Sequence, residues 1–199
     1  MTRRFSSLLR DERGATIVEF ALISPVLLLM LMGLLDLSAN MYTTEMLQGA
    51  IQNAARNSTI EGAPGKAAAL DAMVTRAVRA VAPSANLTFN RRAYSSFTDA
   101  GRPEDYTDVD GDGTCSNGDP YEDANGNGSW DLDRGAAGFG GARDAVLYTV
   151  TVNYKRPFPV AAFIPGQTKD FTLSAVTVLR NQPYGLQAVR PAPVTGNCS

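Results

Sequence analysis

The sequence predicts an α+β protein in which a long N-terminal helix, half of it transmembrane, leads into a small domain with one helix packed on an antiparallel sheet. Three patterns support this fold class: a long apolar run near the N-terminus, one amphipathic helical stripe, and strands of alternating polarity. The 199 residues leave room for one membrane helix and a soluble domain of about 140 residues, enough to bury a core. The predicted segments are a cytoplasmic leader at 1–14, a transmembrane and stem helix at 15–60, an exported domain at 61–184 and a tail at 185–199.

The apolar run defines the predicted membrane helix. Sixteen residues from Phe20 to Leu35 carry no charge, and extending the run back to Ala15 gives 21 residues. As a helix this is about 31 Å, enough to cross a bilayer. Four arginines against two acidic residues precede it, so the leader is expected to stay in the cytoplasm and the remainder to be exported.

The helix is predicted to continue beyond the membrane as a stem. No proline occurs between Leu37 and Thr59, and Leu47, Ala50, Ile51 and Ala54 form a helical stripe. Within the membrane part, Pro25 removes a backbone donor and predicts a local kink.

Glu19 is the unusual residue of this helix, because a carboxylate at the edge of a hydrocarbon layer costs roughly 2.5–3.5 kcal/mol and normally needs a partner. If the chain were cut after Gly14, the new amine would lie on Ala15 and Glu19 would be one helical turn away. In an array of such helices, Glu19 of one subunit could then neutralise the Ala15 ammonium of the next.

This pattern, a basic leader, Gly14 at the cut, and Glu19 followed by Phe20, resembles the processing signature of type IV pilin-like proteins. The run from 14 to 25, together with Gly33 and Asp36, is most similar to the TadE-type minor pilins of tight-adherence (Flp) pilus systems. The resemblance implies a minor pilin or pseudopilin in the bacterial inner membrane before assembly, possessing a leader that a prepilin peptidase removes. Its implied partners are other pilins and tight-adherence assembly proteins.

Two other interpretations also fit the apolar run. The apolar run could be a secretory signal peptide that is cut near residues 37–39, although that site is a poor match and leaves Glu19 unexplained. It could also be an uncleaved anchor in which Glu19 reaches the interface. The alternative function is a membrane-anchored, calcium-dependent adhesive or ligand-binding module that is not built into a filament.

The amino-acid composition excludes several classes of function. The chain contains no histidine, which removes Ser-His-Asp and Cys-His catalysis and the commonest transition-metal ligand. We therefore expect a structural protein and not an enzyme. Basic residues are not clustered with aromatics, so nucleic acid is not an expected partner.

The exported domain is predicted to contain one helix and at least three strands. An apolar stripe that ends before Pro83 predicts a helix over 66–81. Strands are predicted at 86–94, 145–154 and 171–179, and the second has the clearest alternation. The tail from 185 is expected to dangle unless Cys198 ties it down.

An acidic segment at 99–134 interrupts this domain and contains a repeat. The nine residues from Tyr106 and the nine from Tyr121 agree in type at seven positions, which indicates duplication of a small unit. Oxygen side chains at loop positions 1, 3 and 5 with glycine at position 6 are typical of an EF-hand-like calcium loop. The predicted ligands are Asp108, Asp110, Asp112, the Thr114 carbonyl and Asp119 in the first copy, and Asp123, Asn125, Asn127, the Ser129 carbonyl and Asp131 in the second.

The second copy departs from the EF-hand pattern, since Arg134 occupies its position 12, and neither copy has evident flanking helices. Calcium is the expected cofactor, in a structural role. The competing interpretation is a disordered acidic loop. Cys115 and Cys198 are both predicted to be exported and could form a disulfide, with two independent thiols or an intermolecular link as alternatives.

Overall fold

The computed structural model describes residues 15–58, 64–182 and 192–199. It confirms the α+β prediction of a long N-terminal helix followed by a domain with one helix on an antiparallel sheet. The chain divides into two compact units: one comprises residues 1–42 and 155–171, and the other comprises 43–154 and 172–199. The leader and Gly14 lie outside the described residues.

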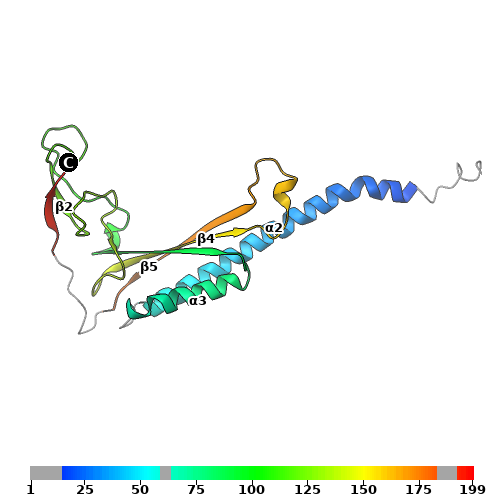
Figure 1. Cartoon of the computed structure of the whole chain (residues 1–199), viewed down its shortest axis with the longest axis horizontal. Helices are drawn as coiled ribbons and strands as arrows, with labels where there is room; N and C mark the ends of the chain where they lie inside the picture. Colours follow the sequence, from blue (N-terminus) through cyan, green and yellow to red (C-terminus); the bar gives the residue numbers. More distant parts are fainter. Residues whose placement is uncertain (1–14, 59–63, 183–191) are drawn as a thin grey trace, which may run out of the picture. The chain divides into compact units, whose positions relative to one another are not determined.

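Helix α2 (Ala15–Ser58) is one continuous helix of 44 residues (Figure 1). Pro25 lies inside it and does not end it. A helix of this length combines the two predicted parts, the apolar run and the stem. Its stem residues Leu47 and Ile51 are fully buried, so this part of the helix belongs to the domain core.

A four-stranded sheet with strand order β3-β1-β4-β5 forms the centre of the domain. Its strands are β1 (Asn86–Tyr94), β3 (Ala136–Ala137), β4 (Ala145–Lys155) and β5 (Asp170–Arg180). Strands β1 and β4 pair antiparallel over their whole overlap, from Asn86 opposite Asn153 to Tyr94 opposite Ala145. The alternation along β4 buries one face, as the sequence predicted.

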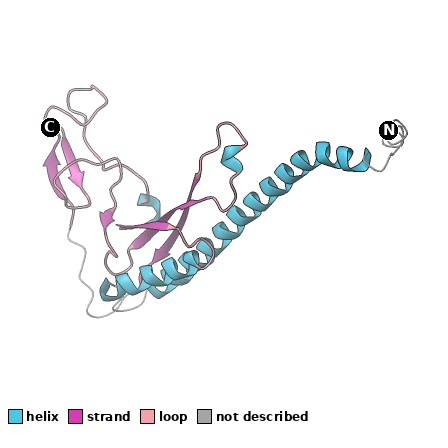
Figure 2. Cartoon of the chain, turned by 45° about the vertical axis from the view of Figure 1, so that its right-hand side comes forward, coloured by secondary structure: helices cyan, strands magenta, loops and turns pink. Residues whose placement is uncertain are grey.

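Helix α3 (Ala67–Arg79) and the stem part of α2 lie on one side of this sheet (Figure 2). Leu70, Val74 and Val78 are the buried side chains of α3, spaced at helical intervals. Asp71 of the same helix accepts hydrogen bonds from Arg91 and Tyr148, which come from the two central strands. Burial, with the neighbouring Asp71 charge adding to it, raises the pKa of Tyr148, so its hydroxyl stays protonated and donates this bond.

Three short strands were not predicted from the sequence. A second sheet is formed by β2 (Pro120–Asp123) and β6 (Val194–Asn197), which pair antiparallel. The sequence analysis predicted neither strand, and the short β3 was also missed. The described part of the tail, 192–199, is therefore held by backbone pairing as well as by the disulfide that joins Cys115 to Cys198.

Candidate functional site

The apolar part of α2 presents its side chains to the outside of the chain. Ile17, Leu22 and Met30 are 72, 74 and 61% exposed, and the most apolar stretch of the helix is not covered by any described part of the protein. Exposing so many large apolar side chains to water would be unfavourable. The helix is long and apolar enough to cross a membrane, and the exposure fits a single-pass anchor.

The predicted assembly residues lie at the start of this surface. Ala15 is the first residue of α2, and Glu19 follows one turn later. The side chains of Glu19 and Phe20 are exposed, and within the described segments Glu19 forms no ion pair. An exposed carboxylate without a counter-charge would be disfavoured in the apolar layer of a membrane.

At the other end of the apolar run, within the same compact unit, lies a buried charged cluster. Asp36 is 4% exposed, and its Oδ2 atom forms an ion pair with Arg156 and accepts a hydrogen bond from Asn40 at 3.1 Å. Its Oδ1 atom is buried without a hydrogen-bond partner among the described residues. The sequence analysis did not identify Arg156. The sequence feature that points to such a partner is Asp36, because a carboxylate that becomes buried is stable only with a counter-charge.

The acidic segment folds into two equivalent loops, so the sequence repeat is also a structural repeat. The carboxylate of Asp108 accepts hydrogen bonds from the N–H groups of Gly111 and Gly113, and Asp123 accepts them from Gly126 and Gly128 in the same way. All four glycines have φ between 77° and 80°. Only glycine adopts this backbone without strain, which explains its recurrence at these positions.

Further hydrogen bonds repeat between the loops at their third and fifth positions. Asp110 accepts from the N–H of Asp112, as Asn125 does from Asn127. Asp112 accepts from the N–H of Thr114, as Asn127 does from Ser129. Hydrogen bonds from the Thr114 and Ser116 side chains lower the pKa of Asp112, so this carboxylate remains ionised at neutral pH.

The second loop has no carboxylate at its twelfth position, and a carboxylate from elsewhere in the chain takes over the corresponding hydrogen bonds. In the first loop, Asp119 accepts hydrogen bonds from the N–H groups of the second and ninth residues, Val109 and Ser116. In the second loop, Glu104 accepts them from the corresponding residues, Ala124 and Asp131. Glu104 is 1% exposed and Asp119 is 2% exposed, so the two carboxylates hold equivalent buried positions.

Several of the predicted ligands in each loop lie close together. Oxygens of Asp108, Asp110, Asp112 and Asp119 lie within 4.8 Å of one another. In the second loop, Asn125 and Asn127 each donate a hydrogen bond to Asp131, so these three side chains also meet. An all-oxygen set of carboxylates and amides suits a hard cation such as calcium. Imidazole and thiolate ligands are not available, because the sequence has no histidine and its two cysteines are joined in a disulfide.

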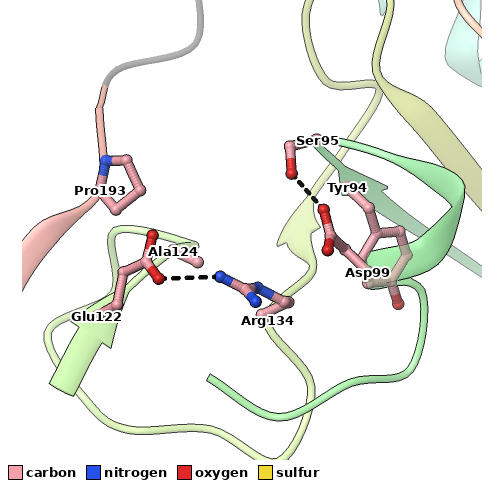
Figure 3. A pocket seen from close by; sticks show the side chains of 7 residues that line it. All are labelled: Tyr94, Ser95, Asp99, Glu122, Ala124, Arg134 and Pro193. Carbon is pink, nitrogen blue, oxygen red and sulfur yellow. Dashed lines mark hydrogen bonds and ion pairs between the residues drawn. The ribbon is translucent and has the colours of Figure 1, made fainter. Parts of the chain in front are cut away.

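Arg134, which occupies position 12 of the second loop, has a structural role in the acidic lobe. This lobe is the acidic segment 99–134. Its guanidinium forms ion pairs with Asp105 at 3.0 Å and Glu122 at 3.2 Å. Figure 3 shows it in a small pocket that Tyr94 and Asp99 also line. The Tyr94 hydroxyl donates to Asp133, and burial together with this bond raises the pKa of Tyr94 to about 12.

An exposed apolar helix that continues into an α+β domain is consistent with a single-pass, membrane-anchored protein. Residues 14–56 match the family described as TadE-like protein. This match supports a TadE-type pilin and stops within α2, so it covers neither α3 nor any strand. The chain matches none of the curated proteins and none of the solved structures.

Proposed function

We propose that this protein is a minor pilin or pseudopilin of a tight-adherence pilus and enters the assembly through α2. The observation that carries the proposal is the TadE-like match over 14–56, which coincides with a continuous helix whose apolar surface is exposed. The described domain would be the exported part. The role is structural, and the chain would be the substrate of a prepilin peptidase and not itself a catalyst.

The proposed assembly step uses two charges of the same helix. Removal of the leader after Gly14 would place an ammonium on Ala15, four residues before Glu19. These residues are about 6 Å apart along the helix axis, so neighbouring helices shifted by one turn bring the ammonium of one against the carboxylate of the next. Both charges are then neutralised in apolar surroundings, where either alone is strongly disfavoured.

Processing is tested by the intact mass of the protein from cells with and without a prepilin peptidase. We expect a species that begins at Ala15 only when the peptidase is present. The matched variants are Gly14→Leu, which should block the cut, and Gly33→Leu, the same change inside α2, which should not. A chain that remains full length in both cells would contradict the proposal in favour of a simple anchor.

We further propose that the two acidic loops bind calcium, which would stabilise the lobe. The first site would use Asp108, Asp110, Asp112, the Thr114 carbonyl and Asp119. The second would use Asp123, Asn125, Asn127, the Ser129 carbonyl and Asp131, with Glu104 in place of a twelfth ligand. Between Glu104 and Asp123 the chain carries eight acidic side chains, whose mutual repulsion a cation would relieve.

Calcium binding is tested by thermal unfolding of the full chain in detergent. At a calcium concentration ten times the Kd of each loop, we expect about 1.4 kcal/mol of stabilisation per loop and about 2.8 kcal/mol in total, a rise in Tm of roughly 6–11 °C. The variant Glu104→Gln keeps the size of the side chain and should lose about half of the rise. The control Glu45→Gln removes an exposed charge from α2 and should keep the whole rise. No change in Tm at millimolar calcium would contradict the proposal.

A further inference from the structure

The loop between β4 and β5 is a folded segment with a fixed surface. The N–H of Arg156 donates to the Lys169 carbonyl at 3.0 Å, and the Arg156 guanidinium donates to the Thr168 carbonyl at 3.1 Å, so the base of the loop is closed. Inside it, a short 3-10 turn (Val160–Ala162) is extended by a hydrogen bond from Ile164 to Val160 at 3.1 Å. Val160 is 6% exposed and anchors the turn.

The loop is attached to α2 at the point where the apolar run ends. Arg156 forms its ion pair with Asp36, which directly follows the last residue of that run, and its guanidinium also lies 4.9 Å from the centre of the Phe171 ring. Asp36 is 21 residues after Ala15, or about 32 Å along the helix. If α2 enters a hydrocarbon layer about 30 Å thick at Ala15, it leaves that layer at the level of Asp36.

The exposed surface of the loop combines apolar and basic groups. Phe163 is 58% exposed, and Pro157 and Pro159 are also exposed. Lys155 and Lys169 flank a hollow that is lined mainly by these prolines, Phe158 and two alanines. Residues 155–169 contain three basic residues and no acidic one. Aromatic and apolar side chains next to lysines are typical of a segment at the surface of a membrane.

We propose that residues 155–169 form a second membrane-contact element, which rests in the headgroup layer of an anionic phospholipid bilayer. Phe163 would enter the boundary of the acyl chains, and Lys155 and Lys169 would bind lipid phosphates. This proposal rests on the proposed insertion of α2. The ion pair between Asp36 and Arg156 would hold the loop at interfacial depth, and a second contact point would restrict rotation of the helix about its own axis.

The test uses the full chain in nanodiscs of phosphatidylcholine and phosphatidylglycerol, with bromine atoms near the headgroup end of the acyl chains as quenchers. A tryptophan is introduced in place of Phe163. The unmodified chain, which contains one tryptophan, gives the baseline. Leu22→Trp reports on the apolar helix, and Val109→Trp replaces an exposed apolar side chain of the acidic lobe, 73% exposed.

We expect quenching of Phe163→Trp several times stronger than that of Val109→Trp, which should stay at baseline. Quenching at Leu22→Trp with none at Phe163→Trp would overturn the loop proposal and leave the membrane anchor intact. Absence of quenching at both positions would overturn the insertion of α2 and the loop proposal with it.

The contribution of lipid charge is measured with the double variant Lys155→Gln/Lys169→Gln in the Phe163→Trp background. In nanodiscs that contain phosphatidylglycerol, each lysine removed should reduce the ratio of inserted to free loop about fivefold. In phosphatidylcholine alone the double variant should match its lysine-containing parent. Equal quenching of the two proteins in both lipids would overturn the proposed binding of anionic headgroups.

Discussion

Replacement of Arg156 by leucine is expected to destabilise the attachment of the β4–β5 loop to α2 by about 3–5 kcal/mol. The side chains of Arg156 and Asp36 are only 13% and 6% exposed, so this variant leaves a buried carboxylate without its counter-charge. The measurement is hydrogen exchange at the loop amides of Phe163 and Ile164, whose hydrogen bonds depend on the loop staying folded. A loss of about 3 kcal/mol corresponds to exchange more than a hundredfold faster.

Two variants separate loss of the ion pair from loss of the side chain. The double variant Asp36→Leu/Arg156→Leu removes both charges and should recover most of the protection, because apolar replacement of a buried pair is often neutral. Arg180→Leu removes an arginine on β5 that is exposed and should change exchange at the loop by less than about 0.5 kcal/mol. If Arg156→Leu exchanged no faster than Arg180→Leu, the ion pair would not hold the loop.

The elements with a local sequence pattern could be predicted from the sequence. The apolar run and the stem stripe predicted the continuous helix, and α2 extends from Ala15 to Ser58. Strand β1 has the predicted bounds, Asn86–Tyr94, and β4 extends one residue beyond the predicted 145–154. In each case the prediction rests on residues close together in the sequence, because apolar side chains recur at the period of the helix or strand whose face they bury.

The second sheet could not be predicted, since its stability comes from distant contacts. Strand β2 begins with proline and contains two acidic residues, while β6 contains glycine, so neither has a strand pattern of its own. They pair because the chain returns to the lobe, where Cys198 is joined to Cys115. Gly196 allows this approach, as a Cβ atom there would lie 2.5 Å from the ring of Tyr121.

The role of Glu104 also depends on chain folding. The repeat predicted the ligand positions of each loop in sequence order, but Glu104 precedes both loops and acts on the second. The sequence points to Glu104 only indirectly. Arg134 occupies the twelfth position, where the first loop has Asp119, so the second loop lacks a carboxylate there. Only the structure identifies Glu104, because its carboxylate accepts the same kind of backbone hydrogen bonds in the second loop as Asp119 accepts in the first.

The variant Glu19→Ala is expected to insert into the membrane normally and to lose its association with other pilins. Insertion should persist because the substitution removes a charge from an apolar helix, which favours the bilayer. Association should fail because the Ala15 ammonium of the neighbouring helix would be left unpaired in apolar surroundings, a cost of about 3–5 kcal/mol or more than a hundredfold in affinity. Glu45→Ala makes the same change on the same helix beyond the apolar run and should retain association.

Assembly through Glu19 is tested most directly by co-purification with the pilins and assembly proteins of the same system after gentle detergent extraction. The proposal predicts that wild type and Glu45→Ala recover these partners, whereas Glu19→Ala is present in the membrane at equal abundance and recovers almost none. Recovery of the partners by Glu19→Ala at the wild-type level would contradict assembly through the N-terminal helix.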